Sequence, residues 1–217
     1  MKARLALPSL SDTLLAVTGA VLCGTGSGAM NNAALGMDAI GLFYDGIRNA
    51  LDLSPDQIGT ASYIVCFALS LFLWFAARKY VSFGTVIYIV VYGAFANLGT
   101  MLAEMIVPPD ILWARIVSAV TGFLILCVGL GIYVAIDIGV DAFTGVVLWL
   151  CDITHKELDS IKVIFDICLA VIGVILGGRI GVFSLVAILT GGPLISLMSN
   201  RFQSRYFKWK LRRELKT

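Results

Sequence analysis

The chain has 217 residues, of which 59% are hydrophobic and 14% are charged, and its formal net charge is +2. Soluble domains average about 45–50% apolar and about 25% charged residues, so this composition excludes a disordered chain, a disulfide-stapled scaffold and an ordinary soluble enzyme. The mean hydropathy of +0.93 predicts instead an all-α, polytopic membrane protein, with a single membrane domain over residues 1–217.

Hydrophobic segments, taken in chain order, predict six transmembrane helices and two shorter helices. A helix needs about 20 apolar residues to cross the hydrocarbon core of a bilayer. The predicted spans are residues 12–35, 57–77, 83–106, 111–137, 158–178 and 181–199. Two apolar segments between them, 38–50 and 141–152, are too short to span the core. We expect them to form re-entrant or interfacial helices, and the sequence leaves open which.

The C-terminal segment, residues 200–217, is rich in lysine and arginine and follows directly on the last predicted span. Phe202, Tyr206 and Trp209 recur at helical spacing, which predicts a basic amphipathic tail on an anionic lipid surface rather than a nucleic-acid site. An even number of spans puts both termini on one side, and the basic tail predicts that this side is the cytoplasm. The expected location is the bacterial cytoplasmic (inner) membrane, with the lipid bilayer as a partner.

The two halves of the chain share a short sequence pattern. Ala-Val-Thr-Gly at 16–19 recurs at 119–122, a shift of 103 residues. At the same shift, five further residues recur: Gly26, Gly28, Gly36, Asp38 and Ala39 match Gly129, Gly131, Gly139, Asp141 and Ala142. The sequence therefore predicts two repeats, residues 12–106 and 111–199, each with three spans.

An odd number of spans in each repeat gives the two repeats opposite orientations in the membrane. Inverted repeats, related by a two-fold axis in the membrane plane, are typical of secondary transporters, whose binding site lies near the midplane between the repeats. If both short segments crossed the membrane instead, each half would have four spans and the repeats would be parallel.

Three motifs carry a resemblance to a known family. The Gly-x-Gly helix, Leu-Gly-x-Asp-Ala at 35–39 and Ile-Gly-Thr-Ala-Ser at 58–62 resemble the YczE/YitT-type bacterial membrane proteins over most of the chain. A proline often precedes the aspartate in that family, whereas Met37 and Val140 hold those positions here. The resemblance implies an integral membrane protein related to transport, and it implies no substrate.

Acidic residues at membrane depth cost about 2.5–3.5 kcal/mol on insertion scales, so they indicate a cavity or a partner. Asp38 and Asp141 are the repeat-related pair, and each begins one of the short helices. One interpretation is that each carboxylate caps a helix N-terminus. The other is that the two carboxylates border a central cavity and bind a cation or exchange a proton. The two interpretations are compatible.

Asp137 lies four residues before Asp141, and on a continuous helix the two carboxylates would share a face and suit a proton-coupled site. If Gly139 breaks the helix, Asp137 faces water instead. Asp166 lies in the fifth predicted span. We expect it to line the cavity or to form an interhelical hydrogen bond, and Lys162, one turn earlier, could pair with it.

Amides and glycines complete the predicted substrate-binding set. Asn31 and Asn32 close the first span and are expected to contact a ligand, to bond to an adjacent helix or to cap the helix. Four glycines favour close helix packing, and they could also bring backbone near a ligand: Gly26, Gly28, Gly129 and Gly131. Such glycine-rich faces would permit a homodimer. Gly191-Gly192-Pro193 predicts a kink or break inside the last span.

Catalytic motifs are missing from the sequence, and its cysteines and single histidine have no metal-ligand spacing. We therefore expect no enzyme activity, no catalytic residue, no metal and no cofactor. The pattern favours a small inverted-repeat transporter for a small solute, either cationic or proton-coupled. The alternatives are a membrane substrate-binding subunit of a multi-component importer and a regulatory membrane protein that does not transport.

Overall fold

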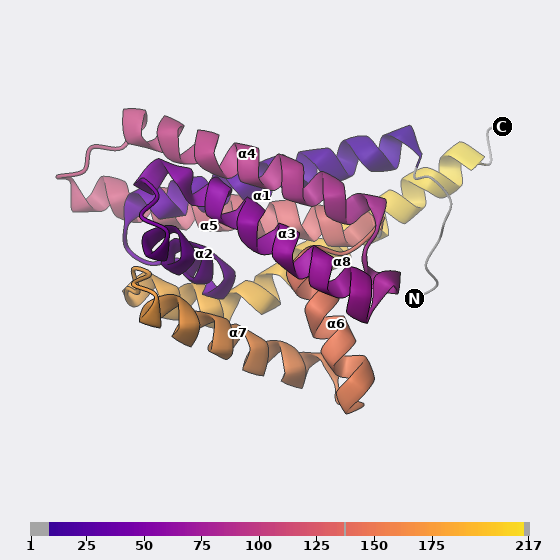
Figure 1. The fold of residues 1–217 in the computed structure, drawn as a ribbon. Coiled ribbons are helices and arrows are strands. Elements are labelled where there is room, and N and C mark those ends of the chain that lie inside the picture. The colour runs from indigo at the N-terminus through magenta and orange to yellow at the C-terminus, as the bar shows by residue number, and fades with distance from the viewer. Residues whose placement is uncertain (1–8, 137, 215–217) are drawn as a thin grey trace.

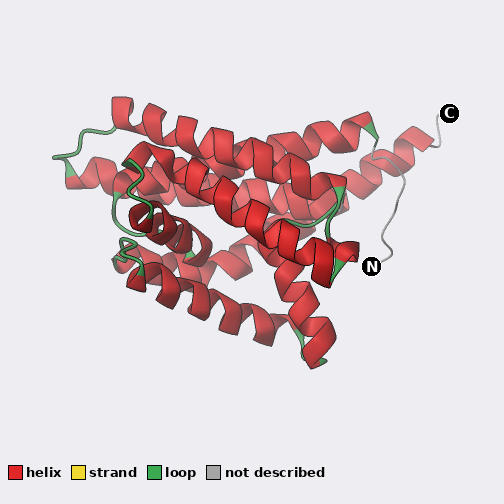
Figure 2. Cartoon of the chain, in the orientation of Figure 1, coloured by secondary structure: helices red, strands yellow, loops and turns green. Residues whose placement is uncertain are grey.

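A computed structural model of the protein describes residues 9–136 and 138–214, and every regular element in those ranges is a helix (Figures 1 and 2). The α-helices are α1 (Leu10–Ala33), α2 (Ala39–Ala50), α3 (Ile58–Ala76), α4 (Phe83–Ile106), α5 (Leu112–Ile136), α6 (Ala142–Thr154), α7 (Leu158–Ile175) and α8 (Val182–Glu214). Two single turns of 3₁₀-helix lie on either side of α3: Pro55–Gln57 precedes it, and Arg78–Tyr80 follows it. The prediction of an all-α protein is confirmed.

Among residues 9–136 and 138–214, five helical segments are long and apolar enough to cross a membrane, which confirms a multi-pass membrane protein. These segments are Leu10–Ala33, Pro55–Ala76, Phe83–Ile106, Leu112–Ile136 and Val182–Ser204. The helix at the fifth predicted span, α7, has 18 residues, but it carries three charged residues and is not among the five. Large apolar side chains lie on the outside of the bundle, where Phe75 is 81% and Met105 is 84% exposed.

The centre of the bundle is the crossing of α1 with α5. A Cβ atom on Gly19 would lie 2.9 Å from the carbonyl oxygen of Gly129, and one on Gly26 would lie 2.4 Å from that of Gly122. Because the order of the contacts is reversed between the two helices, α1 and α5 are antiparallel. Glycines let helix backbones approach closely, so van der Waals contact and lost lipid surface hold this crossing together.

Helices α4 and α8 flank this central pair. A Cβ atom on Gly28 would lie 2.5 Å from the carbonyl oxygen of Ala96, so α1 packs its other glycine face against α4. On α5, Gly131 lies in the same way against Met198 of α8. Each central helix therefore presents one glycine face to the other central helix and one to a flanking helix.

The two segments predicted to be too short to span form helices of 12 and 13 residues, α2 and α6. Helix α2 packs on α7 and α3, and α6 packs on α3 and α7. The backbones of Gly46 and Gly173 meet at the α2–α7 contact, where a Cβ on Gly46 would lie 2.5 Å from the Gly173 oxygen. In Figure 1, α6 runs across the direction of the long helices. Whether either short helix is re-entrant stays a prediction.

Helix α8 differs from the expectation at two places. The sequence predicts a kink or break at Gly191-Gly192-Pro193. The break is wrong, because α8 is one continuous helix of 33 residues with Pro193 inside it, and the kink stays a prediction. Proline removes a single hydrogen bond, and the bonds on either side are enough to keep the helix unbroken. The basic tail is the continuation of α8 as far as Glu214, and residues 215–217 lie outside the described residues.

Candidate binding site at the centre of the bundle

Asp38 and Asp141 both precede a short helix by one residue, as the repeat predicts. The chain turns from the long helix into each short helix through a glycine with positive φ, +106° at Gly36 and +156° at Gly139. L-residues rarely adopt such angles, and a Cβ on Gly36 would also lie 2.2 Å from the Ser184 hydroxyl. The glycines thus fix where each aspartate enters the bundle.

Asp141 is a satisfied N-cap. Its carboxylate accepts hydrogen bonds from the backbone N–H groups of Phe143 and Thr144, both at 3.1 Å, and from the Thr144 hydroxyl at 2.5 Å. These donors belong to the free first turn of α6, where a negative charge also meets the positive end of the helix dipole. The N-cap interpretation of Asp141 is therefore confirmed.

Asp38 occupies the same position before α2, but its side chain makes no cap hydrogen bond. The backbone N–H of Gly41, in the first turn of α2, interacts with the carboxylate without reaching the geometry of a cap bond. Its Oδ1 atom is buried and has no hydrogen-bond partner among the described residues. A buried polar atom without a partner costs free energy, by about 1–3 kcal/mol and more for a charged group. Native proteins contain few such atoms, so an unpartnered carboxylate oxygen indicates a place where a proton, an ion or a ligand binds.

Four buried tyrosines form a continuous row beside these aspartates, which we call the tyrosine row. Tyr133 of α5 contacts Tyr88 of α4, Tyr88 stacks on Tyr92, and Tyr92 contacts Tyr44 of α2, with ring centroids 4.8, 5.3 and 5.9 Å apart. Each of the four side chains is at most 6% exposed. The row therefore crosses the interior from α5 to α2.

The hydroxyl groups of the tyrosine row are unequally satisfied. Tyr92 donates to Ser27 at 2.8 Å, and Tyr44 lies 3.0 Å from the Cys66 thiol. The hydroxyl of Tyr133 is buried without a hydrogen-bond partner among the residues that the structure describes. It is thus a second polar atom in the interior, besides Asp38 Oδ1, that is available to a ligand.

Both aspartates border the tyrosine row. The charge of Asp38 acts on Tyr92, and the charge of Asp141 acts on the other three tyrosines. Both charges also act on the thiol of Cys23, at the middle of α1. The repeat-related pair therefore lies within electrostatic range of the same row of tyrosines. Sequence reasoning missed the tyrosine row, although Tyr88 and Tyr92, four residues apart within an apolar span, are a signal that could have revealed it.

Asp166 forms the ion pair that its spacing predicts. The Lys162 ammonium donates to both carboxylate oxygens of Asp166, each at 2.9 Å. Both groups interact electrostatically with Asp38, so this pair of α7 lies beside the central site. Asp137, the remaining predicted acidic residue, lies outside the described residues.

Asn31 belongs to a second polar site, at the C-terminal end of α2. Its side-chain N–H donates to the Pro55 carbonyl at 2.7 Å, and its oxygen accepts from Arg179 at 2.6 Å. Arg179 in turn donates to Asp45, at 3.1 Å from both Nε and Nη2 and at 2.7 Å from its backbone N–H. Asn32, the other predicted amide, is half-buried.

Asp45 is the centre of this site, which we call the buried ion cluster: Asn31, Asp45, Arg48 and Arg179. Asp45 is 1% exposed and also accepts from Arg48, which lies 2.9 Å away through Nη2. Arg48 is 7% exposed and donates to the Leu53 carbonyl at 2.9 Å. Two guanidinium groups thus surround one carboxylate. The cluster connects α1 and α2 to the connector between α7 and α8.

An exposed ion pair links α6, near its C-terminus, to the connector between α3 and α4. The Lys79 ammonium lies 2.6 Å from Asp152, and the Tyr80 hydroxyl donates to the same carboxylate at 2.5 Å. The side chains of Lys79 and Asp152 are 60% and 45% exposed. The hydrogen bond from Lys79 lowers the pKa of Asp152 below its ordinary value of 3.8.

The four glycines of the predicted binding set lie at helix crossings. Gly26 and Gly129 pack on the facing central helix, and Gly28 and Gly131 pack on α4 and α8. Backbone or side-chain atoms of the neighbouring helix occupy the space where a Cβ would lie, as close packing predicts. A contact between these glycines and a substrate stays a prediction. In the described ranges, no group of three or more His, Cys, Asp or Glu residues could hold a metal ion.

Fold and site define an all-α, multi-pass membrane protein with half-buried aspartates beside a row of buried tyrosines. Residues 10–200 match the family described as Family of unknown function (DUF6198), and the chain belongs to this family. A protein of Haemophilus influenzae described as "Uncharacterized protein" is 23% identical over 179 residues, which are 82% of this chain and 79% of that protein. No solved structure matches. These similarities establish the family and bring no activity with them.

Proposed function

We propose that the protein is a small membrane transporter with two inverted repeats, 12–106 and 111–199. It moves a small solute, cationic or coupled to protons, through a site bordered by Asp38, Asp141 and the tyrosine row. The observation that carries the proposal is the buried, unpartnered oxygen of Asp38 at the centre of the bundle. Ionisable residues inside membrane proteins are expensive and mark ion or substrate pathways.

The α1–α5 crossing supports an inverted repeat. The shift of 103 residues carries Gly19 to Gly122 and Gly26 to Gly129, so it converts the Gly19–Gly129 contact into the Gly26–Gly122 contact. The crossing therefore maps onto itself when the halves are exchanged. Because the two helices are antiparallel, the axis that exchanges them is perpendicular to them and lies in the membrane plane.

Helix order and packing support the same relation. Helices α1 to α4 have 24, 12, 19 and 24 residues, and α5 to α8 have 25, 13, 18 and 33. The α1–α4 contact corresponds to α5–α8, and the α2–α7 contact corresponds to α6–α3. In this proposal α7 also crosses the membrane, as the fifth of six spans. Its Lys162–Asp166 ion pair reduces the cost of charge at membrane depth.

The chemistry of the centre suits a cation or a proton. A carboxylate attracts cations directly, and tyrosine faces attract them through the ring quadrupole. Asp38 alternates between a protonated and an ionised state as the solute binds and leaves, because its Oδ1 has no fixed donor to replace the proton. Asp141 is held by its cap bonds, so its carboxylate stays in place at the start of α6.

Alternating access requires that contacts at the two ends open in turn. The buried ion cluster links α2 to the connector before α8, and Lys79 and Tyr80, in the connector before α4, contact Asp152 of α6. These are corresponding positions in the two proposed repeats. We propose that they are the two closures of the transport cycle.

The proposal keeps both termini in the cytoplasm of a bacterial cell. Basic Arg78 and Lys79 then lie on the inner side, as the excess of positive charge in cytoplasmic connectors favours. The resemblance to the YczE/YitT-type bacterial membrane proteins is compatible with this location, and we include it among the grounds of the proposal.

Flux in liposomes tests the proposal. The purified protein is reconstituted with the pH dye pyranine inside, and tetramethylammonium, choline, guanidinium, Na⁺ and K⁺ are added outside one at a time. We expect at least one cation to move protons or to enter as a radiolabel. Asp38→Asn abolishes this flux, whereas Asp110→Asn, at an exposed connector residue, leaves it unchanged.

Wild-type protein that moves neither protons nor any of these cations would contradict a cation or proton mechanism. Flux by the purified protein alone would exclude the importer-subunit alternative, because such a subunit needs its partner proteins to complete a cycle.

A further inference from the structure

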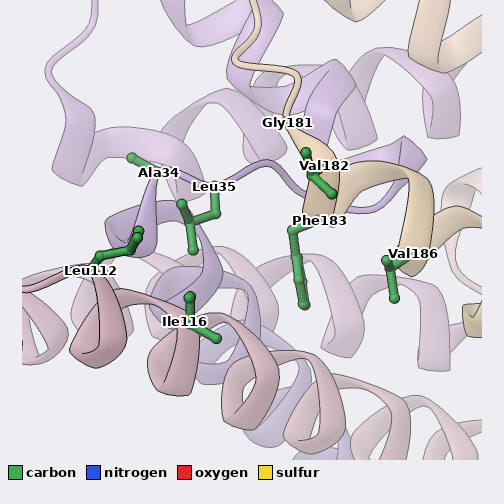
Figure 3. A pocket seen from close by; sticks show the side chains of 8 residues that line it. All are labelled: Ala34, Leu35, Leu112, Ile116, Gly181, Val182, Phe183 and Val186. Atoms are coloured by element: carbon green, nitrogen blue, oxygen red, sulfur yellow. The ribbon is translucent and has the colours of Figure 1, made fainter.

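An apolar pocket of about 380 Å³ lies where α1, α5 and α8 meet (Figure 3). Its walls come from the connector after α1, the first turns of α5 and the start of α8. The lining residues are Ala34, Leu35, Leu112, Ile116, Gly181, Val182, Phe183 and Val186. Each of them is apolar, so the pocket offers no side-chain hydrogen bond to a ligand.

The mouth of the pocket lies on the lipid-exposed surface. Leu112 is 57%, Val182 is 83% and Val186 is 47% exposed. Next to Leu112, Trp113 is 76% exposed in the first turn of α5. Tryptophans at the ends of membrane helices sit at the level of the lipid headgroups, so the pocket begins just below that level, where acyl chains start.

A cationic side chain stands at the rim of the pocket. Arg115 donates from Nε to the Ala33 carbonyl at 2.8 Å and from Nη2 to the Ala34 carbonyl at 3.2 Å. Ala34 itself lines the pocket. A guanidinium has five N–H donors, and these two bonds use two of them. The group therefore both holds the end of α1 and presents positive charge beside an apolar cavity.

We infer that this pocket binds one acyl chain of an anionic phospholipid, with the lipid phosphate at Arg115. The apolar walls suit a lipid acyl chain, and the Arg115 guanidinium suits a lipid phosphate. Because the pocket lies just inside the headgroup level, one lipid molecule can reach both. A zwitterionic lipid offers the same chain but a weaker charge match. The site is separate from the proposed transport site, and it does not depend on the transport proposal.

The test uses the whole protein, freed of lipid in a neutral detergent, and native mass spectrometry. Phosphatidylglycerol and phosphatidylcholine with identical acyl chains are titrated as probes. We expect phosphatidylglycerol to bind about tenfold more tightly, because the choline ammonium of phosphatidylcholine offsets the phosphate charge that attracts Arg115. Equal affinities for the two lipids in the wild-type protein would overturn the inference without any variant.

Two pairs of variants locate the lipid. Val186→Trp fills the pocket and should remove the tight phosphatidylglycerol adduct, whereas Val90→Trp, on an exposed face of α4, should retain it. Arg115→Gln should reduce the preference to near unity, and Arg115→Lys should keep most of it. Circular dichroism checks that each variant is folded. Full binding by a folded Val186→Trp protein would place the lipid elsewhere and overturn the inference.

Discussion

The two short helices, α2 and α6, begin in the same way and are held in opposite ways. At its N-terminus α6 has a capping aspartate with three hydrogen bonds, whereas Asp38 of α2 has a buried oxygen without a partner among the described residues. Near their C-termini the order is reversed. Asp45 of α2 is buried between two arginines, and Asp152 of α6 is exposed.

In the proposed mechanism, one repeated motif is divided between support and function: Asp141 caps α6, and Asp38 serves transport. Helix α2 is fixed strongly at one end, which lets it carry an unsatisfied and costly group at the other. Helix α6 has a conventional N-cap at Asp141 and only an exposed ion pair at Asp152. Its described residues include no buried side-chain polar atom without a partner, so it needs no buried ion cluster at its other end. We therefore expect substitutions at the four aspartates to have very different effects.

The largest effect is expected for Asp45→Asn. The change leaves Arg48 and Arg179 without their shared carboxylate, and breaking a buried ion pair costs about 3–5 kcal/mol because a charge stays buried without compensation. Unfolding in mixed detergent micelles measures the change in free energy. Asp52→Asn, at an exposed residue of the next connector, is the matched control. A loss no larger than that of the control would remove the difference between the two helix ends.

A smaller loss is expected for Asp141→Ala. The change removes three hydrogen bonds at the start of α6, and loss of an N-cap costs about 0.5–2 kcal/mol. The same unfolding assay should show a distinctly smaller loss for Asp38→Ala, whose parent side chain makes no cap bond. Equal losses for the two alanine variants would mean that Asp38 is an ordinary cap.

Asp38→Asn should separate stability from activity. The neutral amide removes the penalty of a negative charge with one buried, unpartnered oxygen, so the free energy of unfolding should stay equal or rise, by about 1 kcal/mol. Flux should be lost in the same preparation. A variant that is both less stable and still active would show that the group has a structural role only.

The smallest effect is expected for Asp152→Asn, because an exposed ion pair contributes little. A carboxyl group with a lowered pKa stabilises the folded state above its ordinary pKa of 3.8 and loses that contribution as pH falls through the lowered value. The unfolding midpoint of the wild type should therefore exceed that of the variant only slightly at neutral pH, and the two midpoints should converge as pH falls through the lowered pKa. A clear loss at neutral pH would show that this end is as firmly closed as the other.

Local patterns predicted much of this fold. Runs of apolar residues located the long helices, the repeated Gly-x-Asp-Ala located the starts of α2 and α6, and the spacing of Lys162 and Asp166 predicted their ion pair. Each of these depends on neighbours within a few residues or on hydropathy alone. The three charged residues of α7 show where hydropathy becomes ambiguous, because a span and a polar helix of that length look alike.

Contacts between distant segments could not be predicted in this way. Arg179 lies 134 residues from Asp45, and in the sequence both arginines of the buried ion cluster look like solvated connector charges. The tyrosine row depends on three helices meeting, which no local spacing encodes. Pro193 likewise predicted a break that the surrounding hydrogen bonds of α8 prevent.

Labelling with dicyclohexylcarbodiimide tests the central claim most directly, because this reagent modifies protonated carboxyl groups in apolar surroundings. Peptide mass spectrometry should find the adduct on Asp38, with protection at high pH or by a transported cation, and none on Asp45, which is ionised between two arginines. An unlabelled Asp38, or equal labelling of Asp38 and Asp45, would contradict the assignment of Asp38 as the group that takes up and releases the proton.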